Sequence, residues 1–159
     1  MKNLTIFIGL FSVLGLTNVS ETHAFEYWQA LPDQPLVPKS NPLTEEKIAL
    51  GKWLFYQTDL SRTKSISCNS CHNLLIGGND GRPFAVGLNK KPTSRSTPNL
   101  WNIGLQTVLY WDGRSKSLEH QSEDHLLDKT IMAMTNAILK ERFASNGQFV
   151  KLFNGAFPN

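Results

Sequence analysis

The 159-residue sequence has only two cysteines, Cys68 and Cys71, and lacks several features that define other classes of protein. One cysteine pair cannot build the disulfide framework that holds many small secreted domains. The charged fraction is 18% and the formal net charge is +3, a surplus too small and too dispersed to indicate nucleic-acid binding. No alternating strand pattern of useful length and no internal repeat is present. These absences leave one mainly helical domain, large enough to enclose a cofactor.

The chemistry of the chain is concentrated in the segment Cys68-Asn69-Ser70-Cys71-His72. Two thiols at this spacing, followed directly by an imidazole, form the attachment pattern of a c-type haem. The thiols add to the haem vinyl groups as thioethers, and His72 is placed to ligate the iron from the proximal side. The pattern therefore predicts one covalently bound haem c held by Cys68, Cys71 and His72.

A redox dithiol, a disulfide and half of a zinc site are the other interpretations of the cysteine pair. A zinc site needs four ligands at suitable spacing, and after residue 24 the chain adds only His72, His120 and His125 to the two cysteines. A thioredoxin-type dithiol is expected near a βαβ pattern, which the sequence does not show. The haem interpretation is favoured, the more so because the N-terminus indicates export.

The first 24 residues have the pattern of a secretory signal peptide. A short positive start at 1–3 precedes an apolar run at 4–16, and residues 22–24 end with small side chains at the positions that a signal peptidase recognises. We expect cleavage after about Ala24 and a mature protein in the bacterial periplasm, with no membrane span left. A retained lipid or helix anchor is the alternative.

The remaining chain predicts an extended segment followed by one helical domain. Four prolines in residues 25–43 disfavour a helix and predict an extended segment. Thr44 and Ser117 are suited to cap helices that follow them, and residues 145–147 form a break. Two more helices are predicted from apolar spacing, one with Ile131, Met134 and Ile138, the other with Phe149, Phe153 and Phe157. The predicted fold is an all-α, cytochrome-c-like domain at 44–159, wrapped on one haem.

A series of short motifs surrounds the haem pattern. They are Leu50-Gly51-Lys52, Leu54-Phe55, Leu60-Ser61, Gly77-Gly78-Asn79-Asp80-Gly81, Arg95 with Pro98, and Tyr110-Trp111-Asp112-Gly113-Arg114. In order and spacing this series resembles the N-terminal haem domain of the bacterial dihaem cytochrome c peroxidases, a family that includes the MauG-type enzymes. The resemblance runs from about Leu43 to residue 159. It implies reduction of hydrogen peroxide at this haem, with electrons from a small redox protein.

The resemblance also implies roles for individual residues. Trp111 matches a tryptophan that lies between the two haems of the family, and Gln121 matches a glutamine on the peroxide side of the first haem. Independently of the resemblance, Lys90, Lys91 and Arg95 form a local basic patch that either pairs with haem propionates or faces water, and Arg95 is the expected propionate partner. The sequence holds no second attachment motif, so a second haem would have to come from a separate chain, unless the sequence is a shortened gene product.

Two substitutions relative to the family pattern bear on activity. Leu88 stands where the family places a histidine that caps the iron, and Ile131, before Met132, stands where it places a proton-transferring glutamate. General acid–base assistance is typically worth about 10²–10⁴ in rate. The candidates for a sixth iron ligand are His120, His125, Met132 and Met134, with His125 preferred. The alternative to a peroxidase is therefore a mono-haem electron-transfer protein or an inactive remnant.

Overall fold

The structure is a computed structural model that describes residues 29–158. The expected signal peptide, residues 1–24, and the start of the expected extended segment lie outside the described residues. The chain divides into two units after residue 34, and the described helices all belong to the second unit. Residues 29–43 are exposed and contain neither helix nor strand, in keeping with their prolines.

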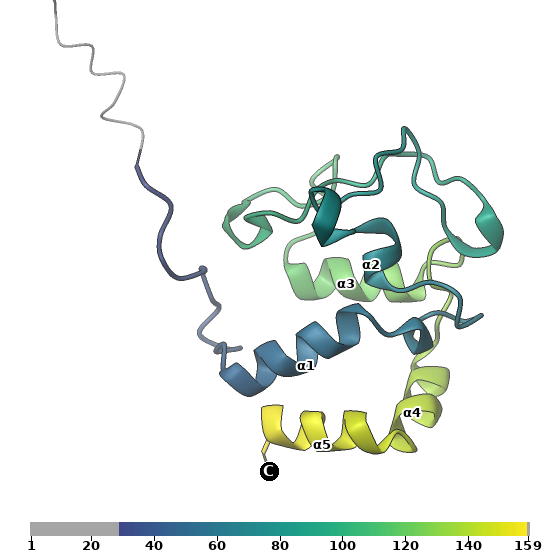
Figure 1. Ribbon diagram of the computed structural model, residues 1–159. Coiled ribbons are helices and arrows are strands. Elements are labelled where there is room, and N and C mark those ends of the chain that lie inside the picture. The colour runs from purple at the N-terminus through teal and green to yellow at the C-terminus, as the bar shows by residue number, and fades with distance from the viewer. Residues whose placement is uncertain (1–28, 159) are drawn as a thin grey trace, which may run out of the picture. The chain divides into compact units, whose positions relative to one another are not determined.

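All regular secondary structure in residues 29–158 is helical, and no strand occurs among them, so the all-α prediction is confirmed. The α-helices are α1 (Glu45–Phe55), α2 (Cys68–Cys71), α3 (Leu118–Leu127), α4 (Asn136–Ala144) and α5 (Gly147–Ala156) (Figure 1). Four short 3₁₀ turns and three isolated β-bridges organise the long loops between α1 and α3. None of the described helices has the length and apolarity needed to cross a membrane.

The four longer helices each begin at a residue whose side chain accepts a backbone N–H bond. The acceptor–donor pairs are Thr44 with Lys47 (3.2 Å), Ser117 with His120 (3.1 Å), Thr135 with Ile138 (3.3 Å) and Asn146 with Phe149 (3.0 Å). These bonds satisfy donors that have no partner within the helix. The predicted caps at Thr44 and Ser117 are confirmed.

The prediction for the helix around Ile131, Met134 and Ile138 was wrong in its extent. Ile138 lies in α4, but α4 begins only at Asn136. Ile131 and Met134 belong to a segment that folds back on α3, where the Met134 N–H donates to the carbonyl of Leu126 at 2.8 Å. Their apolar spacing reflects burial in the core, which an irregular segment can also achieve.

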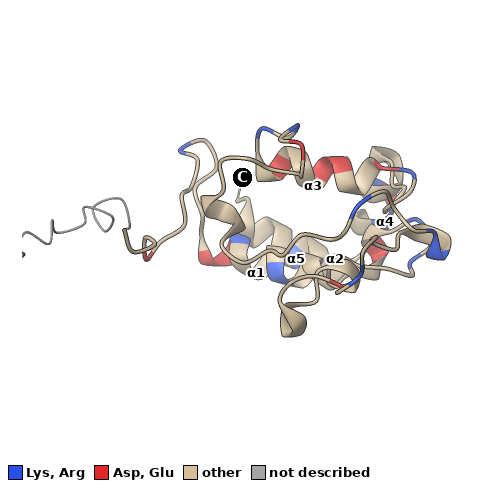
Figure 2. Ribbon diagram, turned by 90° about the horizontal axis from the view of Figure 1, so that it is seen from above, with Lys and Arg blue, Asp and Glu red and all other residues tan. Residues whose placement is uncertain are grey.

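The core lies where α1, α4 and α5 meet the segment before α4. Its buried members are Leu60, Met132, Met134 and Phe143, and Trp53, Leu54, Ile138 and Phe149 are among the partly buried residues packed against them. α5 packs along α1 and against α4. Acidic residues occur on α3 and at the start of α1, whereas basic residues are spread over several elements (Figure 2).

Arg142 on α4 holds the segment that leads from α1 to the haem motif. One guanidinium nitrogen, Nη1, donates to the carbonyls of Asp59 and Ser61, each at 2.7 Å. Nη2 donates to the carbonyl of Arg62 at 3.3 Å. The backbone N–H of Arg62 in turn donates to the carbonyl of Met132 at 2.8 Å. A planar, forked donor thus joins three successive parts of the fold.

We expect Arg142→Ala to lower the free energy of unfolding by about 2 kcal/mol, because hydrogen bonds from a charged donor to buried carbonyls are lost. Arg142→Lys should recover only part of the loss, since an ammonium group lacks the planar fork. Urea denaturation measures both, with the exposed neighbour Glu141→Ala as control. Equal urea midpoints for Arg142→Ala, Arg142→Lys and Glu141→Ala would contradict this role of Arg142.

Candidate functional site

The two thiols and the adjacent imidazole are arranged by the single turn of α2. The hydroxyl of Ser67 accepts the backbone N–H of Ser70, and the hydroxyl of Ser70 accepts the backbone N–H of Ser67 at 2.9 Å. The N–H of His72 donates to the carbonyl of Cys68 at 2.9 Å and ends the turn. This reciprocal capping stabilises a helix too short to persist alone.

His72 is oriented by two backbone carbonyls that reach the same ring nitrogen. Its Nδ1 lies 3.1 Å from the oxygen of Gly78 and 3.1 Å from the oxygen of Pro98. Carbonyl oxygens only accept hydrogen bonds, so Nδ1 carries the proton and the lone pair is on Nε2. Burial lowers the pKa of His72 below its usual value, which favours the neutral ring. The imidazole is thus prepared to ligate a metal through Nε2.

The glycine loop after His72 shapes this support. Gly78 has a φ of +72°, a conformation that glycine adopts without strain. A Cβ at this position would lie only 3.0 Å from the backbone nitrogen of Leu100. The loop can therefore approach the segment that carries Pro98 only because residue 78 has no side chain.

The environment of the thiols argues against the alternative interpretations of the cysteine pair. Burial raises the pKa of Cys68 and of Cys71, and the charge of Asp80 raises that of Cys71 further. Both therefore remain thiols at neutral pH, unlike the activated thiolate of a redox dithiol. They are not joined in a disulfide. Within residues 29–158, no three His, Cys, Asp or Glu side chains gather in a manner suited to a zinc ion.

His125 on α3 is arranged much as His72 is. Its Nδ1 lies 2.7 Å from the carbonyl oxygen of Gln121 and 3.0 Å from the hydroxyl of Tyr110. The rings of His125 and Tyr110 are parallel, with centroids 5.2 Å apart. The carbonyl acceptor places the proton on Nδ1 and leaves Nε2 with its lone pair. The pKa of His72 is lowered by burial first and also by charge on His125, so the two imidazoles lie within electrostatic range.

The other three candidates for a sixth ligand occupy different environments. His120 is exposed, with Nδ1 2.9 Å from the hydroxyl of Ser115 and Nε2 3.8 Å from the carboxylate of Asp124. Met132 and Met134 are buried members of the hydrophobic core. The half-buried His125 is therefore the candidate best arranged to offer a nitrogen to a metal.

The structure brings together Leu88 and Ile131, the two positions where the sequence analysis expects a departure from the family pattern. Leu88 is 5% exposed, and its N–H donates to the carbonyl of Thr130 at 3.0 Å. At Gly87, a Cβ would collide with the same carbonyl, so the two segments touch backbone to backbone. Leu88 and Ile131 thus flank one backbone contact between two segments, and neither side chain carries an imidazole or a carboxylate.

The remaining predicted site residues are Trp111, Arg95 and Gln121. Trp111 is 61% exposed and donates its indole N–H to the carbonyl of Ser96 at 3.1 Å. Arg95 pairs with Asp112 at 3.6 Å and is also well exposed. Gln121 contributes its carbonyl to His125, as described above. Arg95 and Trp111 are therefore held near one another by the Ser96 and Asp112 contacts.

Sequence reasoning missed Thr97 and the role of Tyr110. The hydroxyl oxygen of Thr97 is buried and has no hydrogen-bond partner among the described residues. An unpaired buried hydroxyl costs about 1–3 kcal/mol, and this one lies next to Pro98, whose carbonyl orients His72. No sequence pattern marks a single threonine in this way. The donor set of two thiols and an Nε2 lone pair fits a c-type haem.

Comparison with known proteins gives consistent matches. The family model described as di-haem cytochrome c peroxidase matches residues 45–159. The methylamine utilization protein MauG of Methylorubrum extorquens is 41% identical over 126 residues, 79% of this chain and 36% of that protein. The cytochrome c551 peroxidase of Pseudomonas aeruginosa is 32% identical over 131 residues, 82% of this chain and 38% of that protein.

Solved structures agree with these matches. A MauG-like protein associated with microbial copper homeostasis superposes with a TM-score of 0.73 at 32% identity, over 82% of this chain and 40% of that one. The dihaem peroxidase BthA of Burkholderia thailandensis, at 23% identity and a TM-score of 0.64, shares the fold over 75% of this chain and 34% of that one. The chain therefore spans well under half the length of these relatives.

We expect Gly78→Ala to cost about 1–3 kcal/mol, because an alanine at positive φ is strained and its Cβ meets Leu100. It should also weaken the bond from His72 Nδ1, seen as faster exchange of that ring proton by NMR. Gly81→Ala is the matched control, since Gly81 also has positive φ but has open space around it. A ring proton unchanged in Gly78→Ala would contradict the support assigned to this loop.

Proposed function

The chain belongs to the di-haem cytochrome c peroxidase family, and from that premise we propose that it is a periplasmic c-type haem protein that reduces hydrogen peroxide. The observation that carries the proposal is the geometry of His72, with Nδ1 fixed by two carbonyls and Nε2 left for iron. We propose one haem c, bonded to Cys68 and Cys71. The export pattern of residues 1–24 supports the periplasmic location.

Each residue of the site has a defined task in this proposal. A haem c bound here supplies the one-electron chemistry that peroxide reduction requires. Cys68 and Cys71 would tether it, His72 would hold it through Nε2, and Arg95 would bind a propionate. Trp111, by its match to the family, lies on the electron path, and Gln121 lies on the peroxide side.

The electrons must come from outside the chain, and few groups within it can transfer protons. Reduction of one hydrogen peroxide to two water molecules takes two electrons and two protons. A small redox protein, or a separate chain with a second haem, supplies the electrons. Since Leu88 and Ile131 cannot move a proton, His125 is the group with a free ring nitrogen available for this task. We therefore expect slow turnover by the isolated chain.

A mono-haem electron-transfer protein is the second candidate function. The observation that favours it is the same free Nε2 of His125, which would give two histidine ligands if it bound the iron. The aliphatic side chains of Leu88 and Ile131, which lie at the backbone contact with Thr130, also favour a site without proton transfer. The two functions therefore differ in the role of His125 Nε2, which would transfer a proton in a peroxidase and bind the iron in an electron-transfer protein.

We expect the mature protein, expressed together with a cytochrome c maturation system, to carry the mass of one haem in addition to the polypeptide that begins after Ala24. Cys68→Ala with Cys71→Ala should abolish covalent attachment, as judged by mass spectrometry and haem staining of denatured gels. The matched control is Ser70→Ala, which removes a capping hydroxyl but keeps both thiols. Colourless wild-type protein with the bare polypeptide mass would sink the proposal.

We expect peroxide to react with the haem-loaded protein, and His125→Ala to slow this reaction by about 10²–10⁴, because the remaining proton-transfer group is lost. Stopped-flow absorbance measures the rate, and His120→Ala is the control on the same helix. A low-spin ferric spectrum that is inert to peroxide and becomes high-spin in His125→Ala would instead establish the electron-transfer function.

A further inference from the structure

Residues 109–115 form a loop that precedes α3, and we call it the Tyr110 loop. Its two ends, Leu109 and Ser115, are each 6% exposed and form an isolated antiparallel bridge. Between them, the indole of Trp111 donates to the carbonyl of Ser96 at 3.1 Å and ties the loop to an earlier segment. The loop is therefore anchored at both ends and at one point between them.

The backbone of Tyr110 is strained within this anchored loop. Its φ is +63°, in the left-handed region. A residue other than glycine rarely adopts such a φ, and a bulky side chain makes the conformation costly. Strain of this kind persists where the surrounding contacts over-determine the conformation, and it is concentrated at functional sites. The contacts of the Tyr110 side chain therefore have to account for its conformation.

The first of these contacts comes from Arg114 at the other side of the same loop. The guanidinium carbon of Arg114 lies 3.5 Å from the centre of the Tyr110 ring. Its Nη1 donates to both carboxylate oxygens of Asp112, at 2.8 and 3.0 Å. The carboxylate thus fixes the cation over the aromatic ring, and the cation is attracted to the ring electrostatically. Both interactions restrain the ring of Tyr110.

The second set of contacts joins Tyr110 to α3. Its hydroxyl lies 3.0 Å from Nδ1 of His125 and 3.4 Å from the carbonyl oxygen of Gln121. The same carbonyl oxygen lies 2.7 Å from Nδ1. The Nδ1–H group is therefore shared between two oxygens, and the phenol donates its own proton to the carbonyl.

These contacts fix the imidazole of His125 more firmly than α3 could alone. The carbonyl of Gln121 restrains the ring only at Nδ1 and from within the same helix. The hydroxyl of Tyr110 adds a restraint from a separate segment, and the two rings are parallel within 6°, with centroids 5.2 Å apart. Rotation of the imidazole about its bond to Cβ would break the hydroxyl bond and the parallel packing. The direction of the free Nε2 is fixed as a result.

We propose that Tyr110, held by Arg114, is a positioning residue that keeps the imidazole of His125 in one orientation for proton transfer to or from peroxide. The inference rests on the proposed function and adds a residue that acts through His125. Orientation matters because a displacement of about 1 Å can cost a reacting group about 10²-fold in rate.

The test uses the haem-loaded chain and the substitution Tyr110→Phe, which removes only the hydroxyl. The ring and its contact with Arg114 remain, so the fold should be preserved, and the urea midpoint checks this. Tyr56→Phe is the matched control, because it removes the same hydroxyl from an exposed residue at the end of α1.

The first measurement is the exchange of the His125 Nδ1 proton with water. NMR can follow it in the reduced, carbon monoxide-bound protein, whose iron is diamagnetic. We expect Tyr110→Phe to speed the exchange about fivefold, the effect of one lost hydrogen bond, and Tyr56→Phe to leave it unchanged. Arg114→Ala should also speed it, because the ring of Tyr110 loses the cation that covers it. Unchanged exchange in Arg114→Ala would overturn the part assigned to Arg114.

The second measurement is the rate of the reaction with peroxide by stopped-flow absorbance. Tyr110→Phe should slow the reaction about tenfold, less than His125→Ala does, because the imidazole keeps its bond to Gln121. In the His125→Ala background, Tyr110→Phe should have no further effect, since a residue that acts through another loses its effect with it. A purely structural role of the hydroxyl would slow both backgrounds alike.

Two results would overturn the positioning role of Tyr110. One is an unchanged exchange rate of the His125 ring proton in Tyr110→Phe. The other is an equal slowing of the peroxide reaction with and without His125. Wild-type protein that is inert to peroxide would contradict the proposed function, whereas the exchange measurement would still decide whether Tyr110 orients His125, so the two failures are distinguishable.

Discussion

The bonds from one nitrogen of His72 to two backbone carbonyls are the constraint on which the site depends. Gly78 is six residues from His72 in sequence and Pro98 is twenty-six, yet both oxygens lie 3.1 Å from Nδ1. The bonds fix the tautomer and the orientation of the ring, which a metal ligand requires. They also require a glycine at position 78, because a side chain there would push its loop away from the segment with Pro98 and Leu100. A short capped helix and two irregular loops thus act as one support.

Residues suited to bind a haem and aliphatic residues without ligating or acid–base groups both belong to the candidate site. The side of His72 offers two thiols and an imidazole, whereas Leu88 and Ile131, which we propose stand in place of the family's ligand and proton-transfer groups, are aliphatic. His125 alone among the candidate ligands combines partial burial with a free Nε2, held so by Gln121 and Tyr110. One imidazole can serve either as a ligand or as a proton carrier, and that choice separates an electron carrier from a peroxidase.

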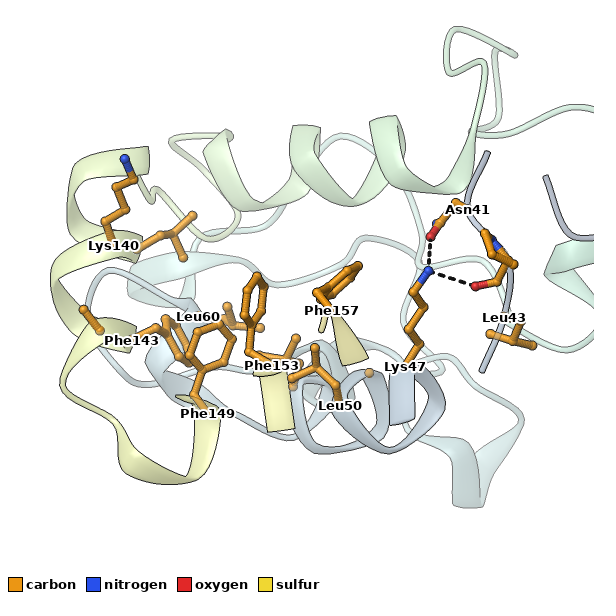
Figure 3. Close-up of a pocket in the computed structure, with 15 residues that line it drawn as sticks. Asn41, Leu43, Lys47, Leu50, Leu60, Lys140, Phe143, Phe149, Phe153 and Phe157 are labelled. Atoms are coloured by element: carbon orange, nitrogen blue, oxygen red, sulfur yellow. Dashed lines mark hydrogen bonds between the residues drawn. The ribbon is translucent and has the colours of Figure 1, made fainter. Parts of the chain in front are cut away.

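Part of the fold is tightly packed, whereas another part leaves large apolar side chains exposed. Arg142 ties α4 to the segment before the haem motif, and the methionines pack into the core beside it. By contrast, Phe153 and Phe157, which line an apolar pocket beside α1, stay in contact with water (Figure 3). Burial of such rings is a large favourable term in folding and association. The chain spans less than half the length of its relatives and exposes these two rings.

The sequence by itself determined the features that depend on near neighbours. The haem pattern, the helix caps at Thr44 and Ser117 and the all-α class follow from contacts a few residues apart, which local patterns encode. Only the tertiary structure decided which carbonyls reach His72, which candidate ligand has a free nitrogen and which hydroxyl, that of Thr97, is left unpaired. It also decided that Ile131 precedes α4, because burial produces the same apolar spacing in a helix and in an irregular segment. Such contacts join residues that are distant in the sequence, and no local pattern specifies which distant residues meet.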